Sequence, residues 1–172
     1  MFIETKEIGP EGLVVSRSID GFRLPLTGAD AIWIDRVHLS GELLKEEDDG
    51  VSFAGRIETR ATLSCSRCLE EYFLPLDLPF DLIYTTGQET PPGDERRLDE
   101  EMVTRVHIDG TRIDLRSLLT EQVYLGLPLK PLCRPDCLGL CPRCGTNLNV
   151  GACTCAEERT EDPRLRILKS LL

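Results

Sequence analysis

Aromatic and basic residues are both in short supply in this chain of 172 residues. Aromatic side chains make up 5% of it, so a hydrophobic core must be built mainly from Leu, Ile and Val. Acidic residues outnumber Lys and Arg by 30 to 20, which gives a formal net charge of −10. Free nucleic-acid-binding proteins usually carry a basic footprint, because neutralising phosphates supplies most of their affinity. The chain as a whole lacks such a footprint.

The charge is distributed unevenly along the sequence. Residues 130–172 carry a net charge of +2, whereas residues 1–129 carry −12. The C-terminal part is therefore the more favourable place for an anion, and its basic side chains are candidate contacts with RNA or another partner. These candidates are Arg134, Arg143, Arg164, Arg166 and Lys169. Ordinary surface charge is the alternative interpretation for each of them.

Signals for a membrane, for secretion and for catalysis are missing as well. No run of 18 apolar residues exists, and the N-terminus has no basic start followed by an apolar stretch, so we expect a cytoplasmic protein that does not enter a membrane. No Gly-rich phosphate loop, Ser-based motif or paired carboxylates can be identified. His38 and His107 lie in strand-like contexts and are interpreted as ordinary strand residues. We expect neither enzymatic activity nor a small-molecule substrate.

Cysteine, by contrast, is abundant, and its eight copies form four close pairs. The pairs are Cys65 and Cys68, Cys133 and Cys137, Cys141 and Cys144, and Cys153 and Cys155. In a reducing compartment such pairs indicate metal ligands before disulfides. Each pair supplies two thiolates from one turn of backbone, and two pairs complete a tetrahedral Zn²⁺ site. All-thiolate sites are closed, so the eight cysteines predict two structural zinc ions.

Chain spacing indicates which pairs share an ion. Eight residues separate Cys144 from Cys153, which is enough for a hairpin that brings the last two pairs together. Only three residues separate Cys137 from Cys141, a short link for two pairs that converge on one ion. The predicted sites are therefore Cys65/Cys68/Cys133/Cys137 and Cys141/Cys144/Cys153/Cys155. Two alternatives stay open: a single C-terminal site with the first pair free, and an iron–sulfur cluster.

Alternating apolar residues predict a β-rich body over residues 1–129. The expected strands are Phe2–Ile8, Leu13–Ile19, Ala31–Leu44, Val51–Ser64, Glu71–Thr85, with prolines typical of an edge or bulged strand, and a short Val103–Ile108. The acidic residues 86–102 indicate a mobile loop. We expect helices over Asp114–Leu125 and Pro163–Leu172. The predicted fold is α+β: a mainly antiparallel β body, one or two helices, and a zinc module over residues 130–172 packed on that body.

Several motifs of the chain resemble the bacterial YceD family, the large ribosomal RNA subunit accumulation proteins. They are Leu63-Ser-Cys65-Ser-Arg-Cys68-Leu69, the run from Cys133 to Asn149, Cys153-Thr-Cys155 and Asp162-Pro-Arg-Leu165. The resemblance implies a role in accumulation or maturation of 23S rRNA, and hence in large-subunit biogenesis. It carries over no catalytic residues.

Three functions are compatible with these observations. The first is a non-enzymatic biogenesis factor that binds rRNA, a ribosomal or rRNA-processing protein, or both, in which case the acidic body could hold a basic ribosomal protein. The second is a redox or metal-handling protein, since Cys-x-x-Cys can act as a dithiol, although the βαβ context of thioredoxin-like proteins is missing. The third, a metal-dependent nuclease, would need exposed carboxylates or an open metal position.

Overall fold

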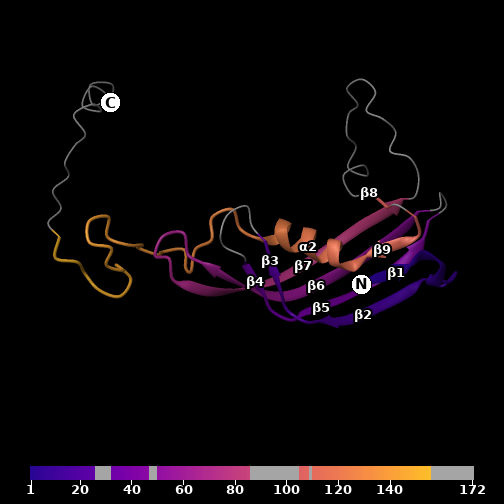
Figure 1. Cartoon of the computed structure of the whole chain (residues 1–172), viewed down its shortest axis with the longest axis horizontal. Helices are drawn as coiled ribbons and strands as arrows, with labels where there is room; N and C mark the ends of the chain where they lie inside the picture. The colour runs from indigo at the N-terminus through magenta and orange to yellow at the C-terminus, as the bar shows by residue number, and fades with distance from the viewer. Residues whose placement is uncertain (26–31, 47–49, 86–104, 109, 156–172) are drawn as a thin grey trace, which may run out of the picture.

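The computed structural model describes residues 1–25, 32–46, 50–85, 105–108 and 110–155. They form a mostly antiparallel β body with one helix, from which a cysteine-rich module extends at one end (Figure 1). The predicted α+β class is confirmed. The acidic residues 86–102 and the predicted helix Pro163–Leu172 lie outside the described residues. The division of the chain at residues 129 and 130 stays a prediction.

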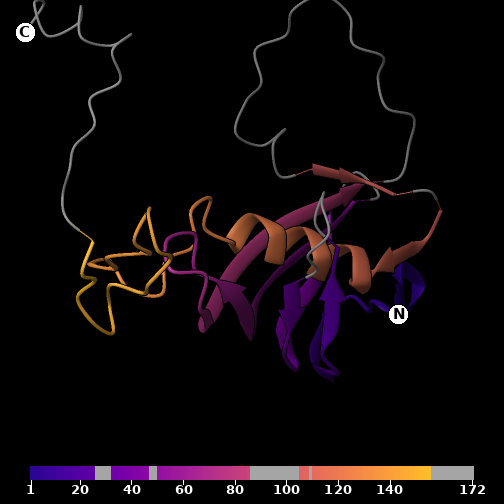
Figure 2. The same ribbon diagram turned by 60° about the vertical axis from the view of Figure 1, so that its left-hand side comes forward.

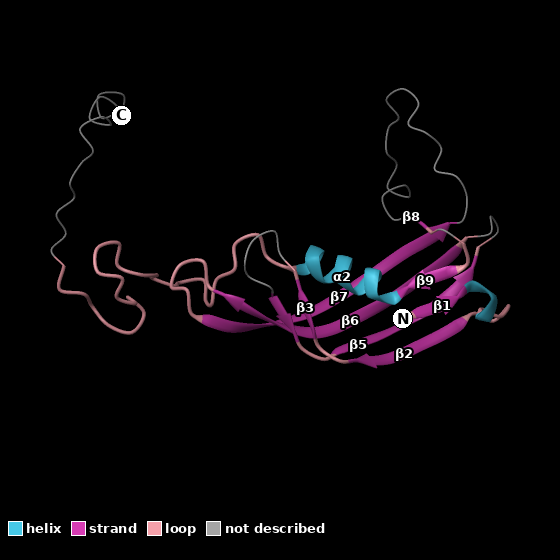
Figure 3. Cartoon of the chain, viewed as in Figure 1, coloured by secondary structure: helices cyan, strands magenta, loops and turns pink. Residues whose placement is uncertain are grey.

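Seven of the described strands make one sheet (Figure 3). They are β2 (Leu13–Ile19), β3 (Phe22–Leu24), β4 (Ile32–Ile34), β5 (Val37–Lys45), β6 (Val51–Ser64), β7 (Glu71–Thr85) and β8 (Arg105–His107). Strands β5 and β4 both pair with one edge of the long strand β6, β2 pairs with β5, and β3 pairs with β4. Strand β7 pairs with the other edge of β6. Strand β8 lies parallel to the end of β7. A separate pair joins β1 (Phe2–Glu4) to β9 (Arg112–Asp114).

Strands β6 and β7 form a long hairpin whose bounds match the predicted ones. They pair along their whole length, from Val51 opposite Tyr84 to Ser64 opposite Glu71. Side chains alternate across a strand, and the apolar side chains of β6, such as Phe53 and Ile57, are fully buried. Strand β7 is an edge strand except where it meets β8, and Pro75 lies in its edge part. Proline has no backbone N–H, and an edge strand tolerates it because the N–H groups on its open side bond to no other strand.

The predicted strand Ala31–Leu44 is two strands, β4 and β5, separated by a bulge. Ile34 lies opposite Ala61, but His38 lies opposite Glu58, so one extra residue has entered this side of the ladder. The Thr59 hydroxyl donates to the Asp35 and Arg36 carbonyl oxygens at 3.2 and 3.3 Å, which stabilises the bulge. The alternation of apolar residues could not show the bulge, because β4 and β5 pair with the same strand, β6, and look like one strand in the sequence.

The predicted strand Phe2–Ile8 is also wrong in its second half. Strand β1 ends at Glu4, and a single 3-10 turn, η1, covers Thr5–Glu7. Ile3 and Ile8 are both buried. Five residues apart in a continuous strand, they would point to opposite faces of the sheet. The turn lets both side chains enter the same core.

Helix α2 (Leu115–Gly126) covers part of the inner face of the sheet against β7 and β1 (Figure 2). The predicted cap is confirmed, because the Asp114 side chain accepts a hydrogen bond from Arg116 N at 2.9 Å. The buried residues of the helix share the face toward the sheet: Leu115, Leu118, Leu119 and Val123. The chain then runs along the sheet toward the β6–β7 turn, where the cysteine module begins. In the described ranges, no helix has the length and apolar character needed to cross a membrane.

Candidate metal centres

The first cysteine cluster is built on the turn that joins β6 to β7. Cys65 and Cys68 lie in that turn, where Leu69 N donates to the Cys65 carbonyl oxygen at 2.9 Å and Cys65 N donates to Glu70 O at 2.9 Å. Leu69 has a φ of 62°, in the left-handed region that a non-glycine residue rarely adopts. The long hairpin therefore ends in a tight knuckle that points two sulfur atoms the same way.

The other half of the first cluster arrives after α2. Cys133 and Cys137 belong to the loop that follows the helix, and two contacts fix that loop on the knuckle. Ser66 N donates to Pro131 O at 2.8 Å, and the Arg67 guanidinium donates to the Cys137 carbonyl oxygen at 2.7 Å. Segments about 65 residues apart are thus joined at a shared centre.

The sulfur atoms of this cluster have the spacing of a tetrahedral metal site. Cys65 Sγ lies 3.7 Å from Cys137 Sγ, and Cys68 Sγ lies 3.7 Å from Cys133 Sγ. Four thiolates at the Zn–S distance of about 2.3 Å would be about 3.8 Å apart. All eight cysteines are among the described residues, and none forms a disulfide bond. The donor set and its spacing therefore fit one metal ion held by Cys65, Cys68, Cys133 and Cys137.

Hydrogen bonds prepare the first cluster for negative charge. Burial by itself raises the pKa of Cys65, but the backbone N–H groups of Cys68, Cys133 and Arg67 outweigh it and lower that pKa to about 6. Burial and the neighbouring sulfur atoms raise the pKa of Cys133 to about 12. Without a cation the cluster thus contains both thiolates and thiols, and a bound metal ion would stabilise all four as thiolates.

The second cluster lies entirely within the module. Gly145 follows Cys144 with a φ of 73° and donates its N–H to the Cys141 carbonyl oxygen at 2.9 Å, which closes a second knuckle. An isolated bridge between Leu140 and Asn147 begins the predicted return of the chain. Cys153 Sγ then lies 3.5 Å from Cys141 Sγ. The four sulfur atoms of Cys141, Cys144, Cys153 and Cys155 all lie within 4.8 Å of one another.

The second cluster is less shielded than the first. Cys144 is exposed, and Cys153 and Cys155 are half-buried, whereas three of the four cysteines in the first cluster are buried. The Thr146 hydroxyl oxygen lies 3.2 Å from Cys144 Sγ, and the hydroxyl and backbone N–H of Thr146 lower the pKa of Cys144 to about 6. Hydrogen bonding to Cys144 and burial raise the pKa of Cys155 to about 12. The two predicted groups of four cysteines are therefore present, and each could hold a metal ion.

Asn149 connects the two clusters. It lies in the loop between Cys144 and Cys153, yet its side-chain Nδ2 donates to Cys137 Sγ of the first cluster at 3.3 Å. Its Oδ1 accepts from Leu138 N at 2.8 Å and from the Arg134 guanidinium at 2.8 Å. Groups that hydrogen-bond metal ligands orient them and tune their basicity. The loop of the second site therefore buttresses the first site.

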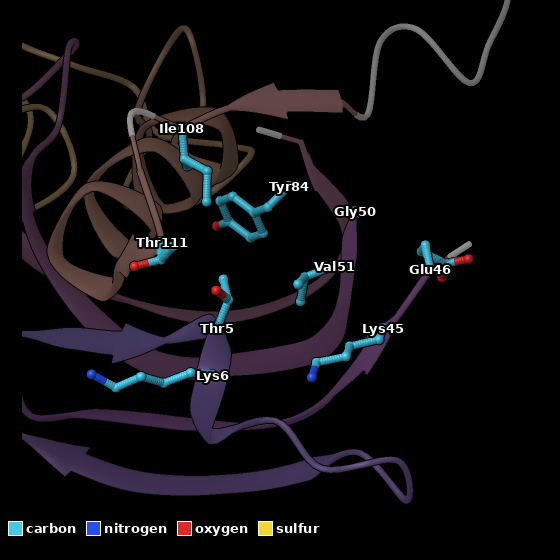
Figure 4. A pocket seen from close by; sticks show the side chains of 9 residues that line it. All are labelled: Thr5, Lys6, Lys45, Glu46, Gly50, Val51, Tyr84, Ile108 and Thr111. Carbon is cyan, nitrogen blue, oxygen red and sulfur yellow. The ribbon is translucent and has the colours of Figure 1, made fainter. Parts of the chain in front are cut away.

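A pocket of about 340 Å³ is another candidate site (Figure 4). It is lined by Thr5, Lys6, Lys45, Glu46, Gly50, Val51, Tyr84, Ile108 and Thr111. Val51 pairs with Tyr84 at the opposite end of the β6–β7 hairpin from the knuckle, about 45 Å away. Burial, together with the charges of Glu121 and Asp114, raises the pKa of Tyr84, so its phenol stays neutral. With no histidine or cysteine in its lining, this pocket is a weaker candidate site than the cysteine clusters.

The model of the family described as large ribosomal RNA subunit accumulation protein YceD matches residues 53–172, a stretch that contains both clusters. The chain belongs to the YceD family. A relative from Mycobacterium tuberculosis, named an uncharacterised protein, is 32% identical over 123 residues, which cover 70% of this chain and 57% of the relative. A chloroplastic YCED homolog 1 from Arabidopsis thaliana, a large ribosomal RNA subunit accumulation protein by name, is 27% identical over 128 residues, 62% of this chain and 40% of the relative.

The chain spans about half the length of the curated relatives it matches. No solved structure matches it significantly. The family match begins within β6, so β1 to β5 lie outside it, and the conclusions about those strands rest on the structure alone.

The predicted contact residues for RNA or a partner are only partly covered by the structure. The Arg134 guanidinium donates to Asn149 Oδ1 and lies 3.6 Å from an Asp136 carboxylate oxygen. These contacts of Arg134 are with residues of the module itself. Arg143 is exposed beside the second knuckle. The other three, Arg164, Arg166 and Lys169, lie outside the described residues. Both histidines are exposed strand residues outside the clusters, His38 on β5 and His107 on β8.

Three supporting residues escaped the sequence analysis. Arg67 and Asn149 hold the first cluster through a backbone carbonyl and a sulfur atom, and the left-handed Leu69 closes its knuckle. The sequence held a weak signal for Asn149, because Asn147 lies two residues before it and asparagine side chains often bond the backbone two residues on in a turn. In the structure Asn147 Oδ1 accepts a hydrogen bond from Asn149 N at 3.0 Å. No local pattern marked Leu69, since its conformation is set by the knuckle.

Proposed function

We infer that this chain is a non-enzymatic factor in the biogenesis of the large ribosomal subunit. It would support accumulation or processing of 23S rRNA by binding rRNA, a ribosomal or processing protein, or both. The observation that carries this inference is the family match, because it spans nearly all of the long hairpin, the helix and both cysteine clusters. The name of the chloroplastic relatives, large ribosomal RNA subunit accumulation protein, supports the same role.

Two zinc ions, one in each cluster, would hold the module. Four thiolates without a histidine or carboxylate leave no open coordination position, which is the pattern of a structural and not of a catalytic zinc site. On this proposal the metal ions shape a binding surface and take no part in chemistry. Zinc-loaded protein incubated with precursor rRNA and Mg²⁺ should leave the RNA intact, and specific cleavage would contradict the proposal.

The charge of the module supports an anionic partner. Its described part carries Lys130, Arg134 and Arg143 against Asp136, while the body is strongly acidic. RNA that approaches the molecule would therefore be repelled by most of the body and attracted to the module end. The proposed location is the cytoplasm, where ribosomal precursors and reduced thiols occur together.

The proposal is tested in cells that lack the chain. The ratio of 23S to 16S rRNA should fall and should recover with the wild-type chain, but not with a Cys65→Ser/Cys68→Ser variant. Affinity purification with and without RNase then separates the two kinds of partner: recovery that is lost after RNase indicates RNA, and recovery that resists RNase indicates a protein. An unchanged rRNA ratio in the deleted cells would contradict the proposed function.

A redox or metal-handling role is the second candidate, and the exposure of Cys144 favours it. An accessible thiolate can react with oxidants or pass its metal to an acceptor. Thiol labelling of zinc-loaded protein before and after mild oxidation decides the redox form. If no cysteine becomes oxidised and no zinc is released, the sites are structural.

A further inference from the structure

A row of side chains lies beside the first cysteine cluster, on the outer face of the sheet, which is the face opposite the buried core. None of these side chains takes part in the metal centres described above. Arg23 lies opposite Trp33, Trp33 opposite Thr62, and Thr62 opposite Phe73, so the row crosses β3, β4, β6 and β7. Trp33 is 45% exposed and Phe73 is 62% exposed. We call these four residues the aromatic row. Trp33 is the only tryptophan of the chain, which otherwise uses aromatic residues sparingly.

An arginine is fixed next to this row. The Arg60 guanidinium carbon lies 4.6 Å from the centroid of the Phe73 ring, and Arg60 Nε donates to an Asp35 carboxylate oxygen at 2.6 Å. The bulge between β4 and β5 places Asp35 there, because Asp35 N donates to the Arg60 carbonyl oxygen at 2.9 Å. The guanidinium is therefore held against an aromatic ring, and an arginine so placed can also stack on an unpaired base.

We propose that the aromatic row binds single-stranded RNA, with one base stacked near each ring, the Arg60 guanidinium beside one of these bases, and the Arg23 side chain beside the phosphates. Neighbouring strands are about 4.8 Å apart, and one strand separates those of Trp33 and Phe73, so the Cα atoms of these two residues are about 10 Å apart. Aromatic side chains on an open sheet bind unpaired bases, because every base has a face that can stack. This inference rests on the proposed function and assigns its RNA contact to a particular surface.

Charge and composition favour RNA over a protein partner at this surface. Farther along the outer face Arg56 is paired with Asp77 at 2.6 Å, and Glu42, Glu58 and Asp81 are exposed. At the row itself Arg60 is paired with Asp35 and Glu71 is exposed, so the charge that favours a phosphate chain there comes from Arg23 and from the basic module next to the row. The row has two large aromatic side chains, one arginine and one threonine, and Arg60 lies beside it. A protein interface normally has a more continuous apolar centre that is depleted of charge.

The sole tryptophan makes the test direct. A short unstructured RNA oligonucleotide is added to the zinc-loaded full chain, and Trp33 emission is recorded together with the anisotropy of labelled RNA. Single-stranded RNA should quench the emission, and the same RNA annealed to its complement should not, because its bases are already stacked. Phe73→Ala should weaken RNA binding by about fivefold or more, the effect of losing one stacked base.

The chain offers a matched control for Phe73. Phe2 is 57% exposed on β1, and Arg112 lies 6.0 Å from its ring centroid while its Nε is 2.6 Å from a Glu4 oxygen. Phe2→Ala should leave RNA affinity unchanged. Equal affinities of Phe73→Ala and Phe2→Ala, or RNA binding without quenching, would overturn the inference.

The remaining outcomes separate the inference from the proposed function. If RNA binds and only Arg143→Ala weakens it, the aromatic row is not the contact, and the proposed function stands. If the wild-type chain binds no RNA, and Trp33 emission shifts only with a purified ribosomal protein, the row is a protein contact. In that case the inference is wrong, and the protein form of the proposed function remains. Circular dichroism and zinc content of each variant show that it is folded.

Discussion

The two cysteine clusters use the same four-thiolate chemistry in different structural settings. In the first, Cys68 and Cys133 are 65 residues apart, and most of the sulfur ligands are buried between the hairpin and the loop after α2. In the second, Cys141 and Cys153 are 12 residues apart, and Cys144 is exposed. The cost of closing a loop grows with its length, so a bound ion restricts the unfolded chain more at the first site. The first site would hold the module on the body, and the second would fold the module itself.

The largest expected effect comes from removing one buried ligand. Cys137→Ser should abolish metal binding at the first site and lower the unfolding free energy of the whole chain, because a structural zinc site contributes roughly 10 kcal/mol or more in isolated fingers. Cys144→Ser, the matched change at the exposed site, should leave the melting of the β body nearly intact. Thermal melting followed by circular dichroism compares the variants. A larger loss for Cys144→Ser would reverse the assignment of the two sites.

The rate of metal loss should also differ between the sites. A chelator that changes colour on zinc binding should withdraw one ion quickly, from the exposed second site, and the other slowly. Cys144→Ser should remove the fast phase, and Cys137→Ser the slow one. Release of both ions in a single phase by the wild-type chain would show that burial does not distinguish the sites.

Asn149 tests whether the sites are coupled. Its side chain donates to Cys137 Sγ from within the loop of the second site, so Asn149→Ala should weaken metal binding at the first site about 10- to 100-fold. Val150→Ala is the matched control, because Val150 is the next residue and is 86% exposed. Competition with a chelator of known affinity gives both values. If the two variants bind the first metal ion equally, the hydrogen bond to sulfur has no role.

Metal affinity at the first site should rise with pH. Hydrogen bonds lower the pKa of Cys65 and Cys137, whereas the pKa values of Cys68 and Cys133 are raised, so at pH 8 an incoming ion must displace at least the protons of Cys68 and Cys133. Below the Cys65 pKa of about 6 that thiol holds its proton too, so the affinity should fall more steeply as the pH is lowered there. Zinc competition across this range measures both slopes. An affinity that does not depend on pH would contradict the thiolate assignment.

The smallest effects concern the residues that close the two knuckles. Leu69 and Gly145 have similar positive φ values, of 62° and 73°. Gly145→Ala should destabilise the metal-bound module by about 1 kcal/mol, because a side chain is disfavoured in that conformation. Leu69→Gly relieves the same strain but frees the unfolded chain, so its stability should stay within about 0.5 kcal/mol of wild type. Chemical denaturation of the metal-loaded variants checks both values.

Much of this arrangement follows from local sequence. The bounds of β6 and β7, the Asp114 cap of α2 and the grouping of the cysteines were all predictable, because strong alternation, capping chemistry and ligand spacing act over short distances. The bulge between β4 and β5, the short turn after β1 and the aromatic row depend on which strands become neighbours. That information is distributed along the chain, and local patterns do not reveal it.

The central claim is that each cluster holds its own ion and that the distant Cys65 and Cys68 are true ligands of the first. The most direct measurement is the number of zinc ions per chain, by native mass spectrometry, in the full-length wild type and in Cys65→Ser and Cys141→Ser variants. We predict two ions in the wild type and one in each variant. A single ion in the wild type, or two ions retained by Cys65→Ser, would contradict the account.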